Sequence, residues 1–380
     1  MNSRDRFNAI LNFENGVENL KYEYGYWAGL LRKWNKQNFI NVNNPPASLN
    51  DSDLVRISLP IGQKKEENLD KFFLNYFNLD PYPSKFPFDL SPLLPEKIIE
   101  ENHEFKIIKD SYGATQKIIK VGTSVPMILI YPIKTAGDFN DYKELYDKDF
   151  KKRLPKDWDD LVVQLKSRDF PIRLGGNPFG FCGMPRHLMG DVNYMLSLYD
   201  NPGLIKDIND FYLDFAMSYW SEILGNVEID WVMIWEDMAF KTGSFISKDA
   251  FKEFLTPYYI KFIDFLKHYG VKNIIVDCDG LVEELIPLWL EAGVTGIFPM
   301  EAVNDLIKIR KNFPKLQMLG GVDKRILIRD DGRSIDKELD KISLLIKEGG
   351  FIPHIDHSIP MDADWYLFRE YREKLNNLIA

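Results

Sequence analysis

The sequence predicts an α/β fold, a (β/α)8 TIM barrel with an N-terminal insertion that forms a lid. From residue 172 onward, short β-branched and apolar runs alternate with helical patterns, which indicates a parallel sheet. Several of these runs end in charged residues directly before a helix, as in barrels that carry catalytic side chains at their strand tips. A chain of 380 residues can form one such domain, so we expect a single domain over residues 1–380.

Seven parallel strands are expected from this pattern. They cover about 22–27, 172–174, 230–235, 273–276, 294–298, 316–319 and 350–354. Helices are expected at about 154–167, 184–188, 192–198, 204–224, 248–269, 281–291, 303–312, 335–348 and 364–378. An eighth strand would close the barrel, and we place it near Met127–Tyr131.

The first third of the chain carries the expected plug and lid. Residues 3–13 have a helical apolar face, with Ser3 as N-cap, that can close the bottom of a barrel. Residues 40–122 are interpreted as an inserted loop and hairpin, with the hairpin at about 105–121. Its aromatic residues are expected to cover the barrel mouth, because long loops in compact domains are usually functional. They are Phe72, Phe73, Tyr76, Phe77 and Tyr82.

Composition restricts the class of partner. The net charge is −9 and there is no basic block, which argues against nucleic acid or an anionic membrane surface as partner. Two cysteines do not make a disulfide framework, which favours a reducing, cytoplasmic setting. We identify neither a signal peptide nor a membrane-spanning apolar run. A homodimer is compatible with these features.

The stretch Ile274–Gly280 carries the strongest chemical signal. Asp277 and Asp279 follow a buried strand, and the alternation of side chains predicts that both point to one side and Cys278 to the other. Two such carboxylates can share a proton, bind a metal cation or hold a cationic substrate. Alternatively, one caps the next helix and the other pairs with a basic residue.

Three other strand ends supply candidate groups. His354 and His357 follow the last strand and, with Asp277 or Asp279, would make a mixed nitrogen and oxygen metal site. Glu236, beside Trp235, is a candidate acid or substrate-orienting group, or an ion-pair partner of Lys241.

Glu301, which follows the expected strand at 294–298, is likewise a candidate acid or substrate-orienting group. Asp323 is most simply a helix N-cap. The glycine-rich stretch Gly175–Gly180 matches no nucleotide-binding motif, and Phe179 within it is expected to line an apolar pocket.

Several motifs together resemble the uroporphyrinogen decarboxylase superfamily, over most of the chain. The motifs are Arg4–Phe7, Tyr26–Trp27, Trp235–Lys241, Phe254–Tyr259, Asp277–Gly280, Leu285–Leu288, Gly320–Arg325 and Gly349–Pro353. The resemblance implies a (β/α)8 barrel and one of two activities. These are decarboxylation of uroporphyrinogen III without a cofactor, and cobamide-dependent methyl transfer with zinc.

The resemblance to the methyltransferases of this superfamily is the stronger one. The decarboxylases carry an early Arg-Gln-Ala-Gly-Arg segment, whereas the corresponding residues here, Gly25–Leu30, contain no arginine. The methyltransferases place His-x-Cys after the central strand and Cys after the last strand. Asp277 and Asp279 occupy the first two places here, and His357 falls near the third. The resemblance therefore implies a metal site with harder ligands, or carboxylates that bind substrate directly.

We therefore expect a zinc-dependent methyltransferase that moves a methyl group from a small methoxylated or methylamine-type compound to cob(I)amide. The chain has no Asp-x-His-x-x-Gly cobamide signature, so the cobamide is expected on a partner corrinoid protein. Asp277, Asp279 and His357 would hold the zinc, and Glu236 and Glu301 would be catalytic. The residues expected to bind substrate are Tyr26, Trp27, Asn177, Phe179 and Trp235. The alternatives are a metal-free decarboxylase of a small acid and a non-catalytic barrel that binds a small ligand.

Overall fold

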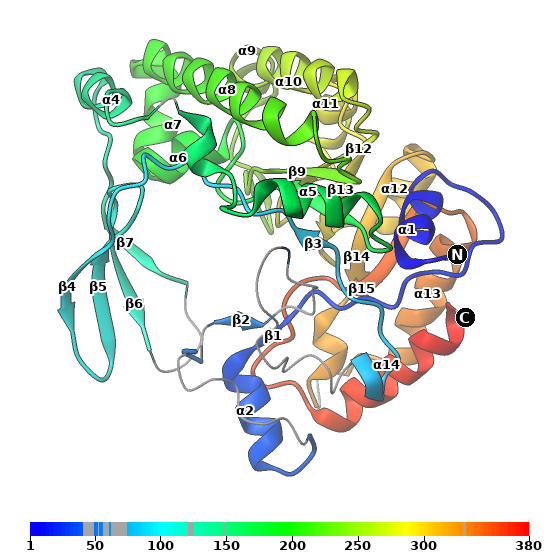
Figure 1. Ribbon diagram of the computed structural model, residues 1–380. Coiled ribbons are helices and arrows are strands. Elements are labelled where there is room, and N and C mark those ends of the chain that lie inside the picture. The colour runs from blue at the N-terminus through cyan, green and yellow to red at the C-terminus, as the bar shows by residue number, and fades with distance from the viewer. Residues whose placement is uncertain are drawn as a thin grey trace.

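A curved parallel sheet surrounded by helices forms the body of the protein in the computed structural model (Figure 1). The structure describes residues 1–40, 49–51, 53–55, 61, 74–120, 125–147, 149–329 and 332–379. The sheet has seven strands, in the order β15-β14-β13-β12-β9-β8-β3. They are β3 (Ser84–Lys85), β8 (Ile172–Gly175), β9 (Trp231–Trp235), β12 (Asn273–Asp277), β13 (Gly296–Met300), β14 (Gln317–Val322) and β15 (Phe351–Ile355).

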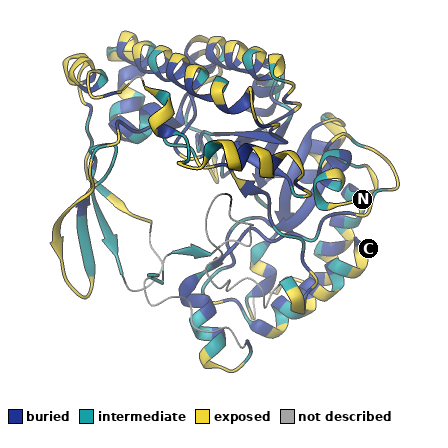
Figure 2. Cartoon of the chain, viewed as in Figure 1, coloured by how far each residue is buried: buried dark blue, intermediate teal, exposed yellow. Residues whose placement is uncertain are grey.

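Helices lie on the outer side of this sheet, and their outward faces are exposed while the strands are buried (Figure 2). Before β9 come α2 (Ala28–Lys36), α4 (Ala136–Lys143), η1 (Phe150–Arg153), α5 (Trp158–Lys166), α6 (Gly183–Met189), α7 (Asp191–Asp200) and α8 (Pro202–Leu224). After it come α9 (Lys248–Phe254), α10 (Thr256–His268), α11 (Ile286–Glu291), α12 (Leu306–Asn312), η2 (Lys324–Leu327), α13 (Ile335–Lys347) and α14 (Trp365–Leu378). The strand–helix alternation expected from residue 172 onward is confirmed.

Apolar side chains from β9, β12, β13 and β14 fill the interior of the barrel. They include Trp231, Ile275, Phe298 and Leu319, one from each strand. Helix α1 (Ser3–Leu11) contributes Phe7, Ile10 and Leu11 to the same cluster. Its contacts lie at the amino-terminal ends of strands, for example from Gln317 Nε2 to the Leu11 carbonyl oxygen at 3.0 Å. The predicted plug is confirmed, although Asn2 rather than Ser3 caps the helix.

The gap between the edge strands β15 and β3 is occupied by residues 19–26. Asn19 Nδ2 donates to the Phe351 carbonyl oxygen at 2.9 Å, and the Lys21 carbonyl oxygen accepts from the Asp80 N–H at 3.0 Å. The parallel strand expected at 22–27 is therefore not formed as predicted, because only β1 (Tyr26–Trp27) has strand conformation and it lies outside the seven-stranded sheet. It pairs antiparallel with β2 (Leu54–Val55). The barrel closes here through side chains and single backbone bonds instead of a regular ladder.

The expected eighth strand near Met127–Tyr131 is wrong. That run forms β7 (Met127–Ile130), which joins β4 (Lys97–Glu101), β5 (Phe105–Lys109) and β6 (Thr115–Ile119) in a separate antiparallel sheet that extends away from the barrel (Figure 1). Pairing with the adjacent β6 closes a much shorter loop than pairing across the barrel. The seventh barrel strand in the sheet is β3, whose two residues lie among prolines and carry no apolar run.

The aromatic residues of the insertion do not form the expected lid, as far as the structure describes them. Phe77 packs on Trp365 and Phe368 of α14, on the outer side of the barrel. Tyr82 lies inside the barrel against Phe298 and His354. Phe72 and Phe73 are outside the described residues. The described aromatic side chains therefore contribute to packing on both sides of the barrel wall.

Candidate metal and active site

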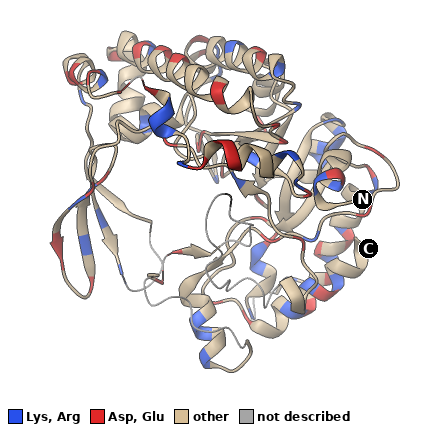
Figure 3. Ribbon diagram, in the orientation of Figure 1, with Lys and Arg blue, Asp and Glu red and all other residues tan. Residues whose placement is uncertain are grey.

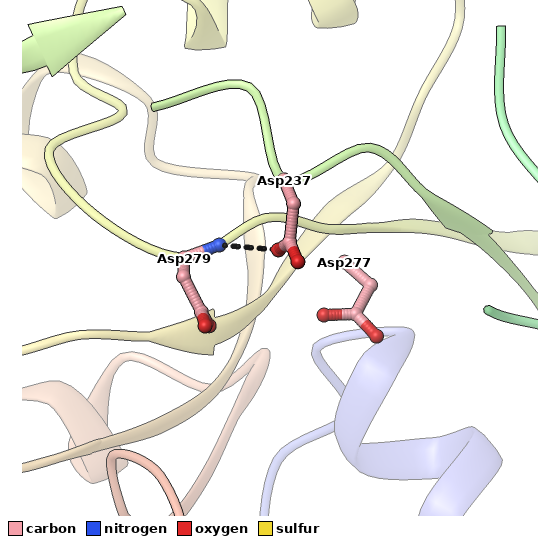
Figure 4. Close-up of side chains that lie close together, drawn as sticks. All are labelled: Asp237, Asp277 and Asp279. Carbon is pink, nitrogen blue, oxygen red and sulfur yellow. Dashed lines mark hydrogen bonds between the residues drawn. The ribbon is translucent and has the colours of Figure 1, made fainter. Parts of the chain in front are cut away.

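Three carboxylates meet at the carboxyl ends of neighbouring strands. Asp277 ends β12, Asp279 follows it, and Asp237 follows β9, which pairs with β12. Each offers an oxygen atom, and these three oxygens lie within 4.8 Å of one another. Figure 4 shows the three side chains gathered around one point, with the Asp279 amide directed at the Asp237 carboxylate.

Side-chain alternation explains why these residues converge. Cys278 lies in the buried layer outside the strands, with its thiol accepting from the Met238 N–H at 3.3 Å, so the flanking Asp277 and Asp279 face the other way. The expectation for Cys278 is confirmed. On β9 the same alternation directs Asp237 inward and Glu236 outward.

Asp237 was not among the predicted metal ligands, and the structure adds it to the carboxylate cluster. It has a left-handed φ of 43°, unusual for a residue other than glycine. Its Oδ1 accepts from the Asp279 N–H at 3.3 Å. The alternation that selected Asp277 and Asp279 would have selected Asp237 and rejected Glu236, had it been applied to β9.

His357 lies beside the carboxylates, as predicted. Its Nε2 is 3.5 Å from Asp279 Oδ2, and its Nδ1 is 2.9 Å from Ser358 Oγ. The ring stacks on Tyr24, which stacks in turn on Phe298. His354, by contrast, is fully buried inside the barrel among these rings, with its Nδ1 2.7 Å from the Ile355 carbonyl oxygen. The structure thus brings His357, rather than His354, to the acidic cluster.

The electrostatics of the cluster favour a bound proton or cation. Burial raises the pKa of Asp279 to about 9, with further increases from Asp237, Asp277 and Glu301. Burial also raises the pKa of Asp237, although the Asp279 amide and Arg186 act in the opposite direction. Oxygen ligands with one imidazole nitrogen form a donor set that zinc and other divalent cations accept. The residues present therefore fit a metal ion.

Glu301 lies at the edge of the cluster. Its Oε2 accepts from the Gly280 N–H at 2.8 Å, and its Oε1 is 3.2 Å from Lys324 Nζ. Asp356 joins the same region, since it accepts from the Ala302 N–H at 3.0 Å and lies 3.9 Å from Lys324 Nζ. Burial raises the pKa of Asp356 to about 6, and Lys324 opposes this. Sequence patterns gave no signal for Lys324, because its partners come from two other strands.

Glu236 occupies a different environment from the one expected. Its side chain is fully buried and accepts hydrogen bonds from the backbone N–H groups of Phe181, Cys182 and Gly183, at 3.0, 2.7 and 2.9 Å. The Tyr259 hydroxyl donates a fourth. Burial raises the pKa of Glu236, and these donors lower it. Glu236 thus joins β9 to α6 and does not face the carboxylate cluster.

The predicted substrate-binding residues divide into two groups. Tyr26 and Phe179 are buried in the layer between barrel and helices, where Phe179 packs on Trp220 and Phe262. Both belong to the same buried layer as Cys278, on the side of the strands away from the carboxylate cluster, which corrects the expectation for both. Trp27 and Trp235 are half-buried and Asn177 is exposed, so these three remain candidates.

Charged residues of both signs alternate along the outer helices in the view of Figure 3, without a contiguous basic stripe. Among the residues that the structure describes, no helix has the length and apolar character needed to cross a membrane. The fold and the site together define a class: an α/β barrel with an acidic, metal-compatible site at the carboxyl ends of its strands.

Comparison with known proteins supports this class and gives the family. Residues 125–372 match the model of the uroporphyrinogen decarboxylase (URO-D) family, and the chain belongs to this family. Among solved structures it is similar to one titled "methyltransferase from Methanosarcina mazei", with a TM-score of 0.58 and 14% identity. The match covers 99% of this chain and 98% of that chain. A search of curated proteins found no match.

Proposed function

We propose that this chain is a methyltransferase that moves a methyl group from a small methoxylated or methylamine-type compound to the cob(I)amide of a partner corrinoid protein. The observation that carries the proposal is the convergence of Asp237, Asp277, Asp279 and His357 at the carboxyl ends of the strands. Membership of the URO-D family supports it, as does the fold shared with the methyltransferase from Methanosarcina mazei.

We propose zinc as the metal, held by Asp277, Asp279 and His357, with Asp237 as a fourth ligand. Zinc bound there would act as a Lewis acid on the oxygen or nitrogen that carries the methyl group. Asp279 and His357 are already 3.5 Å apart, so the protein supplies both types of donor in one place.

Side chains of this protein would supply the proton that the demethylated product needs. When the methyl group leaves, the electron pair of its former bond remains on the oxygen or nitrogen, which must then be protonated. We propose that this proton comes from the Lys324 ammonium group and passes through the Glu301 carboxylate, which is paired with it at 3.2 Å at the edge of the cluster. Trp27, Asn177 and Trp235 would contact the methyl donor.

Metal analysis tests the first half of the proposal. Purified wild-type protein should contain zinc, and Asp279→Ala and His357→Ala should contain much less. Asp160→Ala on α5 and His103→Ala in the β4–β5 loop are matched controls, because both side chains are exposed and distant in sequence from the cluster. Equally negligible zinc in the wild-type protein and the two site variants would contradict the metal assignment.

A transfer assay tests the second half. The protein is mixed with reduced cobalamin and a panel of methoxylated aromatic compounds and methylamines, and formation of methylcobalamin is followed by absorbance. Methylcobalamin formation that depends on Asp279 is the expected result. Carbon dioxide release from a small acid without any corrinoid would instead indicate a decarboxylase. Binding of a small ligand without turnover would indicate a binding barrel.

A further inference from the structure

The start of α6 lies unusually close to the end of β9. A Cβ atom on Gly180 would lie 1.8 Å from the Trp235 carbonyl oxygen, and one on Gly183 would lie 2.1 Å from the same atom. Only glycine is compatible with such an approach at both positions. The close approach places Arg186, one helical turn after Gly183, against the residues that follow β9.

Arg186 holds the backbone of these residues. One of its guanidinium nitrogens, Nη1, donates to the Glu236 carbonyl oxygen at 2.7 Å and also to the Asp237 carbonyl oxygen. The guanidinium carbon lies 5.9 Å from the centre of the Trp235 ring. The Arg186 side chain is only 13% exposed, so these contacts are made largely out of water.

The same residues are held from their other side by β12. The Asp277 carbonyl oxygen accepts from the Glu236 N–H at 2.8 Å and more weakly from the Asp237 N–H at 3.4 Å. The peptide groups around Asp237 are thus bonded through their carbonyls to α6 and through their amides to β12. A left-handed φ at a residue other than glycine persists when its surroundings determine it in this way.

We propose that Arg186 is a positioning residue that fixes Asp237 in the orientation needed to complete the metal site. The part of this inference that is tested by metal binding rests on the proposed function. Arg186 uses two nitrogens of its planar guanidinium group at once, because Nε is paired with Asp191 at 2.8 Å while Nη1 holds the two carbonyl oxygens. Lysine keeps the charge, but its single nitrogen cannot hold Asp191 and the two carbonyl oxygens in this fixed geometry.

Zinc titration of metal-free protein separates these two roles. Arg186→Ala should weaken zinc binding by about 10–100-fold, the range found for residues that orient metal ligands. Arg186→Lys should stay closer to Arg186→Ala than to the wild-type protein. Unchanged or tighter zinc binding by Arg186→Ala, or full retention by Arg186→Lys, would overturn the proposal. Arg369→Ala, which removes an arginine paired only within α14, is the control and should bind zinc normally.

A double-mutant cycle tests whether the effect passes through Asp237. In the Asp237→Asn background, Arg186→Ala should cause little further loss of zinc affinity, because the group that it positions is gone. Additive losses would show that Arg186 acts elsewhere and would contradict the proposal. Millimolar methylguanidinium, which can occupy the space left in Arg186→Ala, should restore part of the affinity.

Amide hydrogen exchange gives a readout that needs no metal. In Arg186→Ala, the peptide covering residues 235–239 should exchange faster than in the wild-type protein, while β14 exchanges at the same rate. If the wild-type protein binds no zinc, the metal part of the proposed function fails and this exchange still decides the role of Arg186. Unchanged exchange at 235–239 would overturn the role of Arg186 whatever the zinc result.

Discussion

The backbone N–H of Asp279 donates to Oδ1 of Asp237 across 3.3 Å, and this bond joins the ends of two adjacent parallel strands. The Asp279 amide dipole faces the Asp237 carboxylate and holds it beside Asp279, although the charge of Asp237 raises the pKa of the Asp279 carboxyl group. The pair is therefore fixed in position before any cation is present. A site of this kind needs little rearrangement of its side chains when it binds a metal ion.

Asp237→Asn tests whether Asp237 belongs to the metal site. We expect this substitution to weaken zinc binding by about 10–100-fold or more. Residues that only orient metal ligands already have effects in that range. Zinc should raise the melting temperature of the wild-type protein, since binding at 100 times the dissociation constant stabilises by about 2.7 kcal/mol. The same zinc concentration should have little effect on Asp237→Asn. Equal stabilisation of both proteins would remove Asp237 from the ligand set.

The barrel was predictable from residue 172 onward because each strand there has its own apolar run and a helical pattern after it. The two segments that close the barrel, residues 19–26 and β3, have no apolar run followed by a helical pattern. Ser84 and Lys85 lie in the sheet because Pro171 and Arg173 offer backbone partners, which is a tertiary effect. Residues 19–26 are held by single bonds to β15 and to Asp80 rather than by a ladder.

The site was predictable where side-chain alternation alone decides direction, as for Asp277 and Asp279. It was not predictable where partners come from distant elements. Nothing near Glu236 in the sequence indicates that the amides of residues 181–183 surround it. Arg186 likewise gains its role only once Gly180 and Gly183 bring α6 against β9.

Glu236→Gln tests the structural role that the geometry gives to Glu236. Each carboxylate oxygen accepts two hydrogen bonds, so the NH2 group of glutamine in place of one oxygen leaves two of the four donors without an acceptor. We expect the free energy of unfolding to fall by at least about 1–3 kcal/mol, which is the cost of leaving one buried donor unsatisfied. Denaturant unfolding measures this loss. Wild-type stability together with abolished methyl transfer would return Glu236 to the catalytic role first predicted for it.

His187, the neighbour of Arg186 on α6, gives a pH-dependent prediction. Burial lowers its pKa from 6.5 to about 4, and its ring packs edge-on against Tyr112. Because the folded state binds this proton more weakly than the unfolded state, His187 contributes stability above pH 6.5 that is lost as the pH falls toward 4. His187→Phe should remove this part of the acid destabilisation. An NMR titration in which the His187 ring has a midpoint near 6.5 would contradict the prediction.

Glu301 can be examined by two substitutions that separate its contacts. Its Oε2 accepts from the Gly280 N–H and so holds the turn that carries Asp279, while its Oε1 pairs with Lys324. Glutamine keeps an acceptor for Gly280 but loses the carboxylate that can pass a proton from Lys324, whereas alanine loses both. We therefore expect Glu301→Gln to bind zinc nearly as the wild-type protein does and to transfer methyl groups about 10²-fold more slowly, at the lower end of the range for general acids.

Glu301→Ala should in addition bind zinc about tenfold more weakly, because the turn around Asp279 is no longer fixed. Calorimetric zinc titration and the methylcobalamin assay measure the two effects separately. Normal methyl transfer by Glu301→Gln would show that the proton reaches the leaving group by another route. Lys324 would be the next group to test, because its ammonium nitrogen lies between Glu301 and Asp356.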